Sequence, residues 1–369
     1  QRIRRMVLSV KDLLRDLVKI PSVNPAFQHD EAAIYGESRV TDFLENFFEN
    51  LGLPTWRQRV HPGRENLFAV FRGQNPPLAV GSILWEVHQD TVGVQGMRID
   101  PFAASEAEGR VWGRGACDVK GGMAAMLAAF SRLRAENAAP RQTTVLALTI
   151  NEESGFSGVK SLARLWGDEA EAQAEGENVR GDLSLDEIRD LRPLRAIVAE
   201  PTMLDVVVSH KGCVRWRCHT HGKAAHTSRP EQGRNAISTM VRVVESLQRY
   251  QTDVLDQGEP DPRCGGPTVC VSTIQGGSGV NTVPDHAVID IDYRVSPGDD
   301  PDVAREQLIA YVTSANADES AFIEHEPPSN HCVGLRGQTN SEWAQHIATT
   351  VDGVDAAAPT QRSQLIGVP

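Results

Sequence analysis

The chain has 369 residues, of which 40% are hydrophobic and 23% charged, and its net charge is −12. This length exceeds what one hydrophobic core usually supports, so two domains are expected. The acidic balance argues against nucleic acid as a partner, because phosphate binding requires clustered lysine and arginine. No apolar run approaches the roughly 18 residues of a membrane span, and no apolar segment follows the amino-terminal charges, so a cytoplasmic protein without membrane contact is predicted.

The first half of the chain alternates between helical and strand patterns. Apolar residues at helical spacing predict helices over residues 10–18, 32–50 and 121–134. Apolar and β-branched runs predict strands over residues 55–60, 66–71, 143–150 and 195–199, the last two of them buried, and one more strand before His88. Residues 166–192 are acidic and hydrophilic and are interpreted as a surface insertion. This order predicts an α/β domain with an open parallel sheet.

The pattern changes near Ser209. Alternating residues predict strands over residues 206–219, 268–274, 287–295 and 321–326, and helices are predicted over residues 233–250 and 302–314. This β-α-β-β-α-β order is that of a ferredoxin-like α+β domain. We predict a catalytic domain of residues 1–207 and 327–369, interrupted by a lid domain at residues 208–326. A last helix is predicted over residues 340–351, and the sequence stops where a strand is expected to begin, which indicates truncation at the carboxyl terminus.

Acidic side chains and one histidine follow successive predicted strands. They are His88 with Asp90, Asp118, the adjacent Glu152 and Glu153, and Glu200. The carboxyl ends of parallel strands share one sheet edge, so these residues are expected to converge on one crevice. Histidine nitrogen with carboxylate oxygen suits zinc and related divalent ions, and hydrolases use two such ions about 3.5–4 Å apart to activate a shared water.

Each of these positions also has a structural interpretation. Asp118 could be a helix N-cap, adjacent glutamates are usually a solvated pair, and Glu200 could simply end a strand before Pro201. A lone His-x-Asp is more often structural, although Asp90 could accept a hydrogen bond from His88 and orient its ring. The ordered set of four favours the metal site.

Three residues of the predicted lid are further candidates. His226 could cap a helix or face solvent, or it could donate a hydrogen bond to a developing oxyanion. Asn281 ends a glycine-rich turn that lacks the residues of a phosphate-binding loop and is interpreted as a ligand-approaching turn. Arg294 could form a surface ion pair or capture a substrate carboxylate.

Nearly the whole chain resembles the M20 metallopeptidase family, which includes acetylornithine deacetylase, succinyl-diaminopimelate desuccinylase, aminoacylases and carboxypeptidase G2-like enzymes. The motifs that carry the resemblance are Ile20–Pro25, His88–Val92, Asp100–Phe102, Gly113–Gly122, Asn151–Glu153, Ala199–Thr202, the loop around His226, Asn281–Pro284 and Tyr293–Arg294. The resemblance implies an α/β/α zinc-hydrolase catalytic domain with an inserted ferredoxin-like lid that dimerises. It also implies two divalent ions, zinc or alternatively cobalt.

The resemblance implies a role for each matching residue. His88, Asp118, Glu153 and Glu200 would be metal ligands, with Asp118 bridging both ions through a cis peptide bond to Val119. Asp90 would orient His88, and Glu152 would be the general base. His226, Asn281 and Arg294 would act from the lid, and His226 would serve either its own site or that of a partner subunit.

Two positions depart from the family pattern. The family's last metal ligand is a histidine near the carboxyl terminus, and neither His331 nor His346 matches it, so a fragment that binds one metal weakly is expected. Glu86 and Val87 stand before His88 where the family usually has a small or amide residue and glycine, which affects the expected local packing.

The predicted reaction is metal-dependent hydrolysis of an amide. Residues 200–212 resemble acetylornithine deacetylase more than the desuccinylase, so removal of an acyl group from an N-acyl amino acid is expected, by a homodimer acting on a small molecule. The alternatives are the desuccinylase activity and that of a dipeptidase, tripeptidase or carboxypeptidase. A non-enzymatic alternative is a metal-poor dimeric binding protein.

Overall fold

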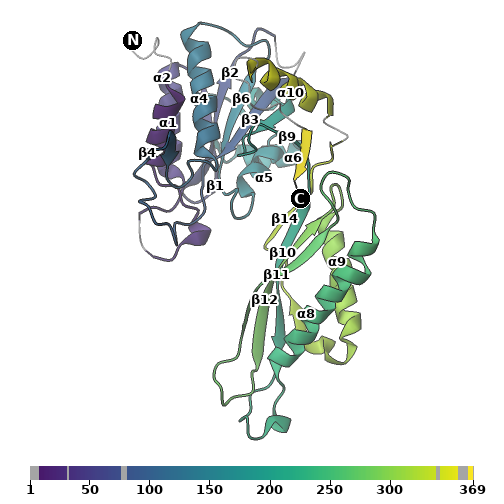
Figure 1. Cartoon of the computed structure of the whole chain (residues 1–369). Coiled ribbons are helices and arrows are strands. Elements are labelled where there is room, and N and C mark those ends of the chain that lie inside the picture. The colour runs from purple at the N-terminus through teal and green to yellow at the C-terminus, as the bar shows by residue number, and fades with distance from the viewer. Residues whose placement is uncertain (1–7, 31–32, 76–80, 338–340, 356–364, 369) are drawn as a thin grey trace. The chain divides into compact units, whose positions relative to one another are not determined.

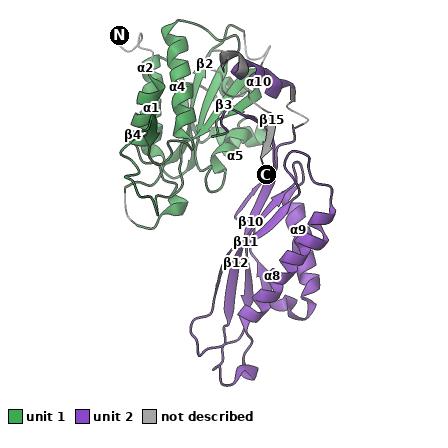
Figure 2. Cartoon of the chain, viewed as in Figure 1, with its two compact units in different colours: residues 1–201 green, residues 202–369 purple. Residues whose placement is uncertain are grey.

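A computed structural model describes residues 8–30, 33–75, 81–337, 341–355 and 365–368 (Figure 1). The chain forms two compact units, residues 1–201 and residues 202–369 (Figure 2). The second unit includes residues 327–369, which the sequence assigns to the catalytic domain. The division into a catalytic domain and a lid was inferred from the order of predicted helices and strands, and it stays a prediction.

The first unit is built on a six-stranded sheet with the order β7-β1-β2-β6-β3-β8. Its strands are β1 (Thr55–His61), β2 (Arg64–Phe71), β3 (Ser82–His88), β6 (Thr144–Thr149), β7 (Val179–Gly181) and β8 (Pro193–Val198). Strand β3 is parallel to both β6 and β8, whereas β1, β2 and β7 add antiparallel pairs. All six residues of β6 are buried, as its unbroken apolar and β-branched sequence predicts for a strand covered on both faces.

Helices cover both faces of this sheet, which confirms the α/β/α architecture (Figure 1). Helices α1 (Val10–Val18), α2 (Ser38–Leu51) and α4 (Lys120–Ala135) bury their apolar sides in one core. On the other face, the core includes side chains of α5 (Ser157–Arg164) and α7 (Leu185–Asp190). The remaining elements of this unit are α6 (Glu169–Gly176), the 3-10 turn Pro25–Phe27 and the hairpin of β4 (Ser105–Ala107) and β5 (Arg110–Trp112).

Three expectations for this unit need correction. Residues 166–192 lie largely at the surface, as interpreted, but they are part of the fold rather than an insertion, because they form α6, β7 and α7, and β7 extends the sheet beside β1. Strand β8 is not buried: it pairs only with β3 at the sheet edge, and Leu194 is 70% exposed. Helix α2 begins at Ser38 rather than near residue 32, and residues 31–32 lie outside the described ranges.

The second unit contains the predicted β-α-β-β-α-β sequence. Its elements are β10 (Gly212–His221), α8 (Ala236–Asp253), β11 (Thr268–Gly276), β12 (His286–Val295), α9 (Pro301–Ala315) and β13 (Ile323–His325). The sheet order is β11-β12-β10-β13, and β14 (Asn330–Cys332) also pairs with β10. Alternate residues of β12 are buried in a core shared with α8 and α9, which leaves the other face of the sheet polar.

A smaller element group completes this unit. Strand β9 (Val206–His210) pairs in parallel with β15 (Leu365–Val368), and α10 (Ser341–Asp355) contacts both strands. The strand predicted over residues 206–219 is therefore two strands separated at Lys211. Short 3-10 helices are Pro230–Gln232, Leu255–Gln257 and Ala317–Phe322. Among the described residues, no helix has both the length and the apolar character that crossing a bilayer requires.

Candidate metal centre

His88 is the last residue of β3, and its side chain is buried. Its Nδ1 lies 2.9 Å from the main-chain carbonyl oxygen of Asp90. A carbonyl oxygen can only accept, so Nδ1 carries a proton, and Nε2 is the nitrogen that a metal ion could bind in place of its own proton. Nε2 faces the Asp118 carboxylate at 3.1 Å.

Carboxylates from three other segments meet at His88. Ligand atoms of His88, Asp118 and Glu153 all lie within 4.8 Å of one another, and Glu200 Oε1 is 4.0 Å from His88 Nε2. Asp118 precedes α4 and is joined to Val119 by the expected cis peptide bond, Glu153 follows β6, and Glu200 follows β8. Because β3, β6 and β8 are parallel, their carboxyl ends bring His88, Glu153 and Glu200 to one edge, and the turn before α4 adds Asp118.

The charges of this cluster favour a bound cation. Burial, together with the charge of Asp118, raises the pKa of Glu153 to about 7, and burial also raises the pKa of Glu200 to about 7. Burial alone would lower the pKa of His88, but the Asp118 hydrogen bond and the neighbouring carboxylates raise it to about 10. A divalent ion would replace the protons that these side chains otherwise hold, and the nitrogen and oxygen donors suit zinc.

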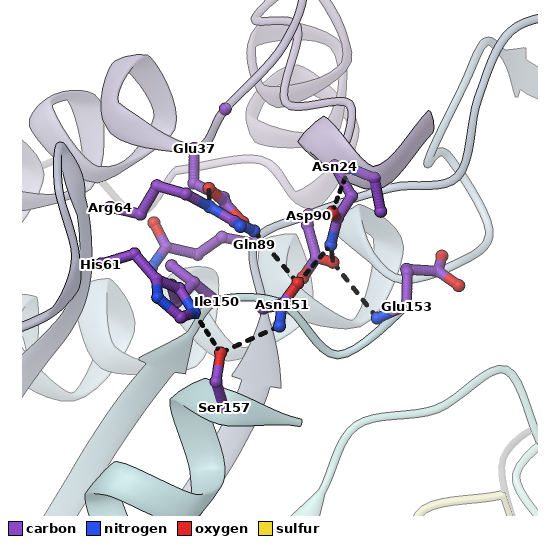
Figure 3. A network of polar contacts seen from close by, with 12 residues as sticks. Asn24, Glu37, His61, Arg64, Gln89, Asp90, Ile150, Asn151, Glu153 and Ser157 are labelled. Atoms are coloured by element: carbon purple, nitrogen blue, oxygen red, sulfur yellow. Dashed lines mark hydrogen bonds and ion pairs between the residues drawn. The ribbon is translucent and has the colours of Figure 1, made fainter. Parts of the chain in front are cut away.

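Asp90 acts differently from the sequence expectation (Figure 3). Its carboxylate oxygen is 3.7 Å from His88 Nδ1, and the hydrogen bond that orients His88 ends on the Asp90 main chain instead. The carboxylate accepts hydrogen bonds from the backbone nitrogens of Glu152, at 3.0 Å, and Glu153, at 3.2 Å, and from Asn24 Nδ2, at 2.7 Å. Asp90 therefore fixes the turn that carries both glutamates.

A polar network behind this turn contains residues that no sequence argument singled out (Figure 3). Asn24 Nδ2 also donates to Asn151 Oδ1 at 2.9 Å, and Arg64 Nη2 lies 3.3 Å from the same oxygen while pairing with buried Glu37. Asn151 has a φ of 63°, a left-handed conformation that asparagine tolerates better than most residues. Asn24 and Asn151 lie inside the recognised motifs, whereas nothing in the sequence marked Arg64 or Glu37.

Two further buried ionisable side chains, Lys120 and Glu86, are close in sequence to Asp118 and His88. Lys120 is 1% exposed, and its Nζ donates to the carbonyl oxygens of Leu17, at 3.1 Å, and Ile20, at 2.7 Å, which ties the start of α4 to the end of α1. Glu86 is buried within β3, where burial raises its pKa and the Thr149 hydroxyl hydrogen-bonds to it. Glu86, which departs from the family pattern, therefore fits into the buried strand because its carboxyl group favours the neutral form.

The lid candidates form two separate groups. The backbone of His226 forms an isolated β-bridge with that of Thr282, and the backbone nitrogen of Thr227 donates to the Asn281 carbonyl oxygen at 3.1 Å. His226 and Asn281 are therefore neighbours. Arg294 lies eight residues along β12 from its His286 end, a span of about 26 Å, and pairs with Asp292 at 3.0 Å. The second unit therefore brings His226 and Asn281 together and leaves Arg294 apart from them.

Two family models match the chain. The peptidase dimerisation domain of M20 enzymes matches residues 208–320, and peptidase family M28 matches residues 66–232. The first covers β10, β11 and β12 of the ferredoxin-like sheet with helices α8 and α9, and the second covers the strands and turns that carry His88, Asp118 and Glu153. Families of this kind use divalent metal ions, in agreement with the donor set.

Curated relatives are similar over most of the chain. A probable carboxypeptidase of Emericella nidulans is 28% identical over 93% of this chain and 74% of its own length. A probable succinyl-diaminopimelate desuccinylase of Staphylococcus aureus is 26% identical, over 92% and 80% respectively. An acetylornithine deacetylase of Buchnera aphidicola is 24% identical, over 80% and 70%.

A solved structure shares the fold. The M20 family metallo-carboxypeptidase of Sulfolobus solfataricus superposes with a TM-score of 0.69 at 16% identity, covering 98% of this chain and 86% of the other. The alternative of a non-catalytic binding protein finds no support among these relatives, which are named for hydrolytic reactions. These matches support the M20 metallopeptidase family for this chain, and the chain is a hydrolase that acts on C–N bonds.

Proposed function

We propose that this hydrolase removes the acyl group from an N-acyl amino acid. The observation that carries the proposal is the convergence of His88, Asp118 and Glu153, with ligand atoms within 4.8 Å of one another, beside Glu152 and Glu200. The substrate class is supported by two relatives, whose names describe removal of an acetyl group from ornithine and of a succinyl group from diaminopimelate.

Four side chains of the centre are suited to hold two divalent ions. His88, Asp118, Glu153 and Glu200 would be the ligands, with Asp118 contributing to both ions, and zinc fits the donors, with cobalt as the alternative. Bound there, divalent ions would polarise the scissile carbonyl group and lower the pKa of a water molecule.

Glu152 is placed to move the proton. Its backbone is held by Asp90 at 3.0 Å, and burial among the other carboxylates raises the pKa of its side chain. A carboxylate with a raised pKa accepts a proton from water more readily and can return it to a leaving group. Glu152 therefore takes the proton of the attacking water and passes it to the amine nitrogen of the product.

The lid supplies substrate contacts in this proposal. His226 donates a hydrogen bond to the carbonyl oxygen as negative charge develops, and Asn281 and Arg294 bind polar groups of the amino acid. An acyl amino acid is much shorter than the span of about 26 Å along β12 that separates Arg294 from the His226 end. With a match to a dimerisation domain, this separation supports a homodimer in which His226 serves the partner's centre.

Three variants test these roles. Glu152→Gln should lower the release of acetate from N-acetylornithine by 10²-fold to 10⁴-fold, the range expected for a lost general base, while the bound metal is kept. The exposed Glu49→Gln should behave as the parent. Mixing Glu152→Gln chains with His226→Ala chains should restore activity if His226 acts across the dimer. A Glu152→Gln chain with the parent rate would refute the proposal.

A second candidate is a carboxypeptidase, which the 28% identity to the Emericella nidulans protein favours. Both reactions use the same proton transfer and differ in the bond that is presented to the centre. The two are separated by comparing kcat/KM for N-acetylornithine, N-succinyl-diaminopimelate and amino-blocked dipeptides. A higher value for the dipeptides would replace the deacylase proposal with the carboxypeptidase one.

A further inference from the structure

Three histidines of the second unit, none of them part of the centre described above, gather on the polar face of the lid sheet. His219 and His221 lie two residues apart on β10, so they share one face of the sheet. His286 on β12 is the cross-strand partner of His221. Cys218, next to His219, and Ala287, next to His286, are buried in the core shared with α8 and α9. Neighbouring residues of a strand point to opposite faces, so the three imidazoles lie on the other face of the sheet.

Two of these rings present nitrogen atoms to each other. His219 Nδ1 and His286 Nε2 are 3.0 Å apart. Two imidazole nitrogens bound to one divalent ion at 2.0–2.1 Å are separated by about 2.9–3.3 Å, depending on the coordination geometry. The ring of His221 has its centroid 5.8 Å from that of His286, and its side chain is 48% exposed, so it can rotate towards the same point.

Carboxylates orient the two histidines of β10. Glu326 Oε1 lies 2.7 Å from His219 Nε2, and Glu324 Oε2 lies 2.8 Å from His221 Nε2. An ionised carboxylate only accepts, so in both rings Nε2 carries the proton and Nδ1 keeps the lone pair. A carboxylate on the far nitrogen is the arrangement that commonly fixes metal-binding histidines.

We propose that His219, His221 and His286 form a second metal site, which takes a divalent transition ion that prefers imidazole, such as Zn²⁺. Glu324 and Glu326 hold the ligands in the binding tautomer. In the described conformation two nitrogens already converge, and rotation of His221 supplies the third. The ion joins β10 to β12, and through the glutamates it also ties the segment that starts with β13 to the sheet.

The full chain, stripped with a chelator and dialysed against Zn²⁺, tests the site. The double variant His219→Ala/His286→Ala should bind one ion fewer per chain than the parent, by elemental analysis, with hydrolysis unchanged because the metal centre is intact. The control is His331→Ala, a partly exposed histidine of β14 that pairs with Asp302 and should leave the count unchanged.

A second measurement addresses the orienting carboxylates. Glu324→Gln/Glu326→Gln keeps all three ligands and should weaken Zn²⁺ binding at this site about 10-fold to 100-fold, measured by calorimetric titration. The inference is overturned if the parent and His219→Ala/His286→Ala bind the same number of ions with the same affinity. It is also overturned if the count falls equally in His331→Ala.

Discussion

Asp90 is 1% exposed, and its carboxylate organises the turn that carries Glu152 and Glu153. The same residue also holds His88 through its main-chain oxygen, so it acts on both the ligand and the general base without being either. At the scale of single residues, the precision of the centre therefore depends on buried hydrogen bonds behind it.

Asp90→Ala should destabilise the protein by about 3 kcal/mol, because one buried and two partly buried donors would lose an acceptor. A buried donor left unsatisfied costs about 1–3 kcal/mol, and relaxation partly offsets the sum. Urea unfolding followed by circular dichroism measures this change. The exposed Glu49→Ala should stay within about 0.5 kcal/mol of the parent. An Asp90→Ala chain as stable as the parent would show that the turn does not depend on these bonds.

The sequence was sufficient to name the side chains that meet at His88 but not the bonds that hold them. His88, Glu153 and Glu200 were predictable because each follows a strand, and parallel strands place their ends together, whereas Asp118 lies in the turn before α4. The partner of the Asp90 carboxylate depends on side-chain rotamers and on residues 60 or more positions away, such as Asn24 and Glu152. Neither the side-chain rotamers nor these distant partners can be predicted from a local sequence pattern.

At the scale of elements, the sequence pattern of a strand predicted where the strand lies along the chain better than it predicted whether the strand is buried. Strand β6 is apolar and central, and its burial followed from its sequence. Strand β8 has a similar composition, yet it lies at the edge, because strand order depends on how distant segments pair. The same holds for residues 166–192: their acidic composition correctly indicated exposure, but it did not predict that β7 would pair with β1 and extend the sheet.

The last strand of the lid core contains a histidine that links stability to pH. His325 Nδ1 accepts a hydrogen bond from Trp216 Nε1 at 3.0 Å, which requires that nitrogen to be unprotonated. Burial, with the nearby charge of Arg305, lowers the pKa of His325 to about 4. Between pH 6.5 and 4 the unfolded chain binds a proton at this residue and the folded chain does not, so stability falls as pH falls through this window.

His325→Gln should remove this contribution while keeping an acceptor for Trp216. From the shift in pKa, the parent should lose about 3 kcal/mol more stability than the variant between pH 7 and pH 4. Urea unfolding of both proteins at the two pH values gives the difference, from which carboxylates common to both cancel. Equal losses in the two proteins would mean that His325 does not titrate in this way.

At the scale of the whole molecule, the metal-binding cluster and the match to the dimerisation domain lie in different units. The first unit, residues 1–201, contains all of the acidic side chains that surround His88, and the second matches the dimerisation domain. The net charge of −12 includes several carboxylates of the centre that burial pushes towards their protonated forms. A cation at this position is therefore expected to stabilise the fold as well as to support hydrolysis.

The most direct measurement is the metal content and hydrolytic rate of Asp118→Ala, made in the His219→Ala/His286→Ala background so that ions at the lid do not contribute. After dialysis against Zn²⁺, the account predicts that this chain loses at least one ion relative to its background and hydrolyses N-acyl amino acids and peptides at least about 10²-fold more slowly. An Asp118→Ala chain with the same ion content and the same rate as its background would contradict the metal centre.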